Sequence, residues 1–255
     1  MPSAAAPGLR GPAAPPTRGL ARARRRSPQG DDTLPAVADS RPAALPPAQR
    51  TVGQLIAESI RLYGARFWTV LPLGLPFVVV DIVGIGHGVN VQTLLLWAFA
   101  PLFCAAYVRA SQLVTGGAPS LSALVAAAIV FLPFPILLRI FILPGIAWFG
   151  AFGLAVPAAV GEGLGVRSAL RRGRALGRVD LVHAIGGIAA LGLVYGVSRA
   201  FLLVLLHTQG SQTQAVALVL ADLVLSPLLF VGAALLYVDQ AARTTSPVSD
   251  TKVGV

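Results

Sequence analysis

Hydrophobic residues form long runs through the middle of the chain, separated by short polar segments. One of them, residues 121–160, is about 40 residues long, which is too long for a single helix at about 1.5 Å per residue to cross about 30 Å of hydrocarbon. We divide it near Leu143-Pro144-Gly145. The pattern then predicts an all-α, polytopic membrane protein with six transmembrane helices, at about residues 68–86, 91–108, 121–141, 143–160, 181–206 and 215–238.

Two shorter segments, 51–66 and 165–178, have apolar residues on one helical face only. The first begins with "TVGQ", which matches a capping box with Thr51 at the cap and Gln54 three residues on. The second places arginines at i, i+4, i+7 and i+11 on one stripe: Arg167, Arg171, Arg174 and Arg178. We expect both to be interfacial helices, with the basic face of the second on anionic lipid headgroups. An effector site on this face is the alternative.

The two ends of the chain differ from the 51–243 membrane domain in composition. Residues 1–50 combine proline, alanine and arginine, a mixture that cannot bury enough apolar surface to offset the entropy of ordering. No continuous apolar core follows their arginines, so they do not match a signal peptide. We therefore predict disordered cytoplasmic tails at 1–50 and 244–255.

Charge distribution gives the expected orientation. The chain carries a net charge of +10 with only 12% charged residues, and its positive residues gather beside alternate ends of the apolar runs. The segments at the opposite ends, 87–90, 142–145 and 207–214, contain no lysine or arginine. The positive-inside rule therefore places both termini in the cytoplasm. Because the charge flanks apolar runs and does not cover a soluble surface, we expect no nucleic-acid binding. The dominance of arginine, alanine and glycine suggests a GC-rich bacterium, and hence its inner membrane.

Three motifs carry a family resemblance. The stretches "RTVGQLIAESIRLYGARFW" (50–68), "VPAAVGEGLGVRSALRR" (156–172) and "LLYVDQAAR" (235–243) resemble the polytopic membrane domain of bacterial glycerophosphoryl diester phosphodiesterases and of related stand-alone, uncharacterised membrane proteins. In the two-domain enzymes, catalysis belongs to a separate soluble barrel. The resemblance therefore implies a membrane module without that activity.

Four charged residues fall inside the predicted spans: Asp81, Arg139, Arg199 and Asp222. Each costs about 2.5–3.5 kcal/mol at the bilayer centre, so we expect each to have a partner. Helical rise places Asp81, Arg199 and Asp222 about 8–10 Å from the outer ends of their spans. We expect Arg199 to pair with Asp222, on consecutive spans, and Asp81 to pair with Arg139. These pairs either fix helix packing or form a charged pathway for substrate or protons.

Sequence motifs for catalysis and cofactors are missing. His87, His183 and His207 lack metal-binding spacing, "GEGLGVRS" has neither a preceding strand nor a following GK[ST], and the single cysteine, Cys104, has apolar neighbours. We expect no metal, no cofactor and no enzymatic activity. The preferred interpretation is an accessory or lipid-organising membrane module with an unidentified membrane-protein partner or lipid. The alternative is a transporter or lipid-translocation protein that uses the buried charges, with an intramembrane enzyme as a distant third.

Overall fold

Helices make up the regular structure of residues 46–245, the part of the chain that the structure, a computed structural model, describes. The predicted all-α fold class is confirmed. The predicted tails are residues 1–50 and 244–255, and most of both, residues 1–45 and 246–255, lies outside the described residues. Inside the predicted N-terminal tail, Pro47–Gln49 forms a short 3₁₀ helix, so regular structure begins a few residues before the expected start.

The described residues contain five candidate membrane spans, or six when a bent helix pair counts as one span, and six is the predicted number. The bounds of these five are Phe67–Gly84, Leu121–Ile140, Ile142–Gly161, Leu181–Leu205 and Ser211–Thr245. The bent pair consists of Val89–Ala98 and Ala100–Thr115, which meet at an angle of 59°. Pro101, in the first turn of the second helix, lacks the N–H that a continuous helix would use there.

Most of these spans are assembled from shorter helices. Their bounds along the chain are α1 Val52–Ala65, α2 Phe67–Val70, α3 Leu75–Gly84, α4 Val89–Ala98, α5 Ala100–Thr115, α6 Leu121–Phe131, α7 Phe134–Ile140, α8 Ile142–Phe152, α9 Ala155–Gly161, α10 Val166–Val179, α11 Leu181–Leu205 and α12 Ser211–Thr245. A 3₁₀ turn, Leu71–Gly74, joins α2 to α3. The break between α7 and α8 falls at the extended residue Phe141, and Pro144 lies within the first turn of α8. The break thus lies two residues before the segment Leu143-Pro144-Gly145, near which the division was predicted, because proline is tolerated in a first helical turn.

The start of α1 matches the sequence pattern. The Thr51 hydroxyl accepts a hydrogen bond from the Gln54 N–H, and the Gln54 side chain accepts one from the Thr51 N–H at 2.9 Å. The predicted capping box is confirmed.

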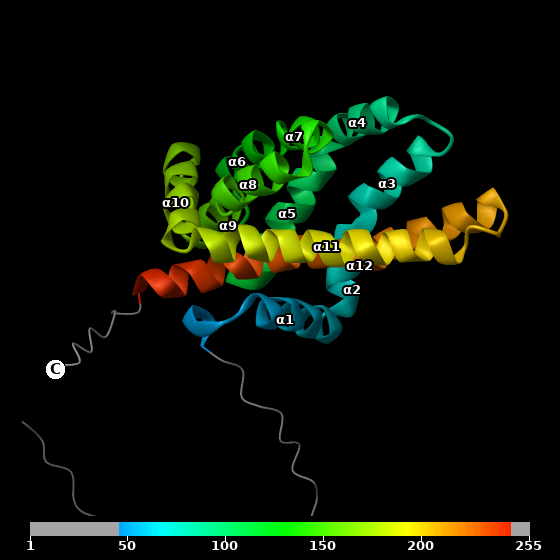
Figure 1. The fold of residues 1–255 in the computed structure, drawn as a ribbon. Coiled ribbons are helices and arrows are strands. Elements are labelled where there is room, and N and C mark those ends of the chain that lie inside the picture. Colours follow the sequence, from blue (N-terminus) through cyan, green and yellow to red (C-terminus); the bar gives the residue numbers. More distant parts are fainter. Residues whose placement is uncertain (1–45, 246–255) are drawn as a thin grey trace, which may run out of the picture. The chain divides into compact units, whose positions relative to one another are not determined.

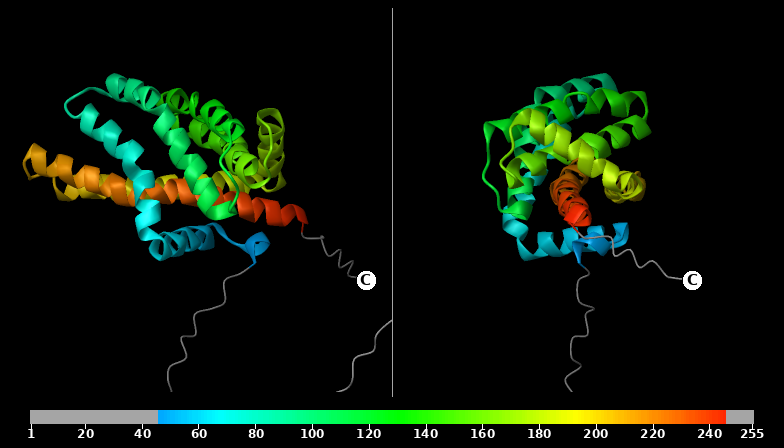
Figure 2. Two further views of the ribbon diagram at one scale, coloured as in Figure 1. Left: turned by 180° about the vertical axis from the view of Figure 1, so that it is seen from behind. Right: turned by 90° about the vertical axis from the view of Figure 1, so that its left-hand side faces the viewer.

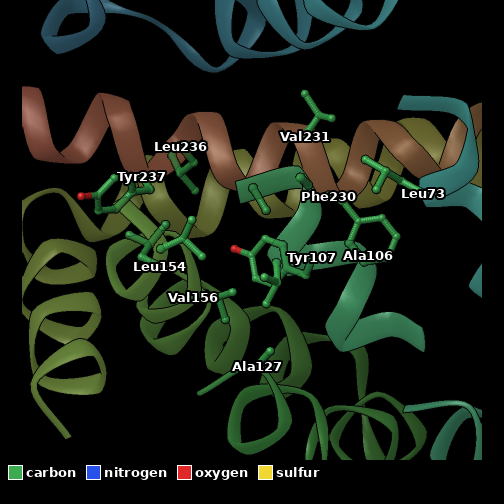
Figure 3. Close-up of a cluster of buried hydrophobic side chains, with 14 of the residues drawn as sticks. Leu73, Ala106, Tyr107, Ala127, Leu154, Val156, Phe230, Val231, Leu236 and Tyr237 are labelled. Atoms are coloured by element: carbon green, nitrogen blue, oxygen red, sulfur yellow. The ribbon is translucent and has the colours of Figure 1, made fainter. Parts of the chain in front are cut away.

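Helix α12 occupies the centre of the bundle. It runs beside α11, while α1 crosses it on one side and α5–α9 lie on the other (Figures 1 and 2). Residues 230–237 of α12 are all buried, and Phe230, Val231 and Leu236 belong to the same buried cluster as Leu73 of the 3₁₀ turn, Tyr107 of α5 and Leu154 just before α9 (Figure 3). The core therefore forms around the C-terminal half of α12. Its N-terminal half and most of α11 are less covered.

Candidate functional site

An ion network joins three helices near the turn between α11 and α12. Arg199 on α11 donates through Nη2 to Oδ2 of Asp81 on α3 at 2.6 Å, and through Nη1 to Oδ2 of Asp222 on α12. The Tyr195 hydroxyl donates to Asp222 Oδ1 at 2.7 Å and accepts from Arg199 Nη1 at 3.1 Å. We call these four residues the Arg199 network.

Helix geometry explains how the Arg199 network forms. Tyr195 and Arg199 are four residues apart, which places both side chains on the same face of α11. The side chain of Asp222 is fully buried, whereas those of Arg199 and Asp81 are 25% and 19% exposed. Both oxygens of Asp222 accept hydrogen bonds, so this carboxylate is fully satisfied.

The structure supports one predicted pair and changes the other. Arg199 contacts Asp222 as expected, but Asp81 also contacts Arg199. The predicted Asp81–Arg139 pair is wrong: Arg139 is an exposed residue near the end of α7 and donates to Asn90 Oδ1 at 3.0 Å. The physical reason is that α7 packs against α4, which carries Asn90, whereas Asp81 lies on α3. Depth along a span does not specify which helices are neighbours.

Tyr195 is the member of the Arg199 network that the sequence analysis missed. A tyrosine one helical turn before a buried arginine is a recognisable signal, because its hydroxyl can reach the same partner.

A large apolar cavity of about 880 Å³ lies between α11 and helices α3, α5–α8 and α12. It is open on one side, since Gly196 and Val197 on its lining are exposed. Tyr195 also lines it, so the cavity borders the Arg199 network. The aromatic residues of the lining from the other helices include Phe77, Phe103, Tyr107, Phe131, Phe134, Phe149 and Phe230. We call this space the α11 cavity.

The spacing of the GxxxG motif of α11 favours a close contact between helices, but the motif faces a cavity. Gly192 and Gly196 permit close helix contact in principle. A Cβ built at either position meets no atom within 4 Å, so neither glycine packs against another helix of the described chain. Both line the α11 cavity instead, and their lack of side chains enlarges it.

The predicted basic face lies on α10. Arg167, Arg171, Arg174 and Arg178 are all exposed, while Ala169, Gly173, Leu176 and Gly177 on the other side of the helix are buried. The Arg174 guanidinium also lies 5.9 Å from the centre of the Phe152 ring. The face is therefore available to anionic groups along the length of α10.

A second set of ion pairs lies at the other end of α12. Arg50 contacts Asp239 at 3.0 Å, and Arg243 contacts Asp180 and the Arg50 carbonyl. Glu162, after α9, pairs with Arg172 on α10 at 3.0 Å. The contacts of Arg50 and Arg243 join the start of α1, the start of α11 and the end of α12, and the Glu162–Arg172 pair joins the end of α9 to α10.

Residues 46–245 contain no group of three or more histidine, cysteine, aspartate or glutamate side chains placed to hold a metal ion. Comparison of the chain with family models, with curated proteins and with solved structures finds no match.

Proposed function

We propose that this chain is a non-enzymatic membrane module that binds membrane lipid, with an acyl chain in the α11 cavity. The observation that carries the proposal is the cavity itself, which has a volume of about 880 Å³ and a lining of aromatic and aliphatic side chains. Ligand sites in proteins are typically about 300–1,000 Å³ and mostly apolar. Apolar cavities do not hold water well, and the abundant apolar molecules around a membrane-spanning bundle are lipid chains.

Two further features support a role in organising lipid. The exposed arginines of α10 are suited to anionic headgroups, and the positive-inside rule places this face at the cytoplasmic surface of a bacterial inner membrane, with both termini on that side. The resemblance of residues 50–68, 156–172 and 235–243 to the membrane domain of glycerophosphoryl diester phosphodiesterases suits a module that works beside lipid-related proteins.

The test narrows the α11 cavity without disturbing packing. Gly196→Leu adds a side chain where a Cβ meets nothing within 4 Å, so the bundle should accept it. We expect lipid bound to the protein after gentle-detergent purification, measured by native mass spectrometry, to fall at least several-fold.

The matched control is Val204→Leu on the same helix. Val204 is 69% exposed and does not line the cavity, so this change should leave bound lipid unchanged. Equal lipid retention by Gly196→Leu, Val204→Leu and the wild-type protein would contradict the proposal. A stoichiometric protein in the same preparation would instead support an accessory role for a membrane complex.

The Arg199 network favours a second candidate, transport or lipid translocation. Ionisable residues within spans commonly mark substrate or ion pathways. Reconstituted protein would then move lipid or solute across vesicles, and Arg199→Ala would abolish this flux. Lipid binding without flux favours the module.

A further inference from the structure

Acidic residues in the described part of the chain are paired with arginines one to one, with a single exception. Outside the Arg199 network, each acidic side chain of residues 46–245 contacts an arginine of its own: Glu58 with Arg61, Glu162 with Arg172, Asp180 with Arg243 and Asp239 with Arg50. Each of these pairs is neutral.

The Arg199 network departs from this balance. Asp81 and Asp222 share one guanidinium, and among residues 46–245 no other cation forms an ion pair with either. Fully ionised, the network carries a net charge of −1. All of its members lie in candidate spans, where water is scarce and an unpaired charge is costly. Carboxylate groups in such places lose their charge by taking up a proton.

We infer that the Arg199 network is a proton-binding site, with one proton held on the carboxyl group of Asp81. This inference does not rest on the proposed lipid-binding function. A bound proton makes the network neutral, like the four pairs elsewhere in the described chain.

Hydrogen bonding assigns the proton to Asp81. Asp222 accepts from Tyr195 through Oδ1 and from Arg199 through Oδ2, an arrangement that suits an ionised carboxylate, in which both oxygens are acceptors. Asp81 accepts only from Arg199, through Oδ2. Asp222 is also fully buried, whereas Asp81 is 19% exposed and can exchange a proton with its surroundings.

The charged groups that face Asp81 are Arg199 from α11 and Asp222 from α12, with the Tyr195 hydroxyl between these two. Helix α4 and the 3₁₀ turn Leu71–Gly74, which also pack on α3, contain no titratable residue. The titratable residues of α5 have no ion pair or hydrogen bond with Asp81 in the described chain: Cys104, Tyr107 and Arg109.

Counting protonated carboxyl groups by infrared spectroscopy tests the inference. The full chain in lipid nanodiscs at neutral pH should show one protonated carboxyl band that shifts in D₂O. Asp81→Asn and Asp222→Asn should each reduce the count from one to zero, because one carboxylate then balances one guanidinium. Glu162→Gln, which alters a pair outside the network, should leave the count at one. Absence of the band in the wild type, or its survival in either asparagine variant, overturns the inference.

Conservative variants locate the proton. Lengthening the protonated side chain changes its carboxyl frequency, so Asp81→Glu should move the band while Asp222→Glu leaves it in place. The opposite result overturns the assignment to Asp81. These measurements use no lipid binding, so they succeed or fail separately from the cavity-narrowing test.

Discussion

Replacing Arg199 by methionine should destabilise the fold more than any other single arginine substitution in the spans. Methionine keeps the long apolar stem of the side chain and removes the guanidinium. The guanidinium donates to Asp81, Asp222 and Tyr195, which come from three different helices. Its loss leaves the fully buried carboxylate of Asp222 with the Tyr195 hydroxyl as its one remaining donor in the network.

The expected cost follows from the burial of the partners. Removing one member of a buried ion pair costs about 3–5 kcal/mol, because the other charge is left uncompensated. One effect moves the value toward the lower limit: the Asp222 carboxylate, left without its cation, can take up a proton. We expect a loss of about 3 kcal/mol in the free energy of unfolding.

Reversible unfolding by SDS in mixed detergent micelles, followed by circular dichroism, measures this loss. Arg139→Met is the matched control, since Arg139 is exposed and donates to the neutral side chain of Asn90. Its cost should be less than about 1 kcal/mol. If Arg199→Met costs no more than Arg139→Met, the argument that the network holds α3, α11 and α12 together is refuted.

Two further predictions concern packing and orientation. A Cβ built on Gly173 of α10 would lie 2.7 Å from the Ala155 Cα. Gly173→Leu should therefore lower stability by about 1–3 kcal/mol, measured as a lower thermal midpoint in detergent. An unchanged midpoint would mean that α10 does not pack closely on α9. In a Cys104→Ala background, a membrane-impermeant maleimide should label Gln212→Cys in intact spheroplasts and Arg171→Cys only in inverted vesicles, and the reverse pattern would contradict the proposed orientation.

The hydrophobic pattern was sufficient to predict the all-α membrane fold, because spans are set by local properties: the length of an apolar run and the need to satisfy the backbone within it. The exact position of the break between the third and fourth predicted spans was harder to predict. Proline at 144 is accommodated in a first helical turn, and the chain breaks at Phe141, a residue with no breaking tendency of its own. Such a break depends on which neighbours α7 and α8 find in the bundle.

For the candidate site too, features set by local sequence could be predicted and features set by tertiary packing could not. Depth along the spans correctly predicted the Arg199–Asp222 pair, because consecutive antiparallel helices are neighbours by connectivity. Asp81 was assigned the wrong partner because α3 precedes α11 by about a hundred residues, and its place beside α11 and α12 is set by tertiary packing. The α11 cavity could not have been predicted: the spacing of Gly192 and Gly196 is the same whether a helix or an open space faces them.

The position of the α11 cavity follows from how α11 is held. Toward its N-terminus α11 packs tightly, with a Cβ on Gly187 only 3.1 Å from Leu55 and 3.4 Å from Leu236. Toward its C-terminus the Arg199 network ties it to α3 and α12. Between these two regions α11 runs along α12, and another side of it lines the cavity, so both regions help to hold α11 away from the facing helices. Lipid retention should therefore depend on the network as well as on the cavity: Gly196→Leu should lose lipid while keeping its stability, whereas Arg199→Met should lose both.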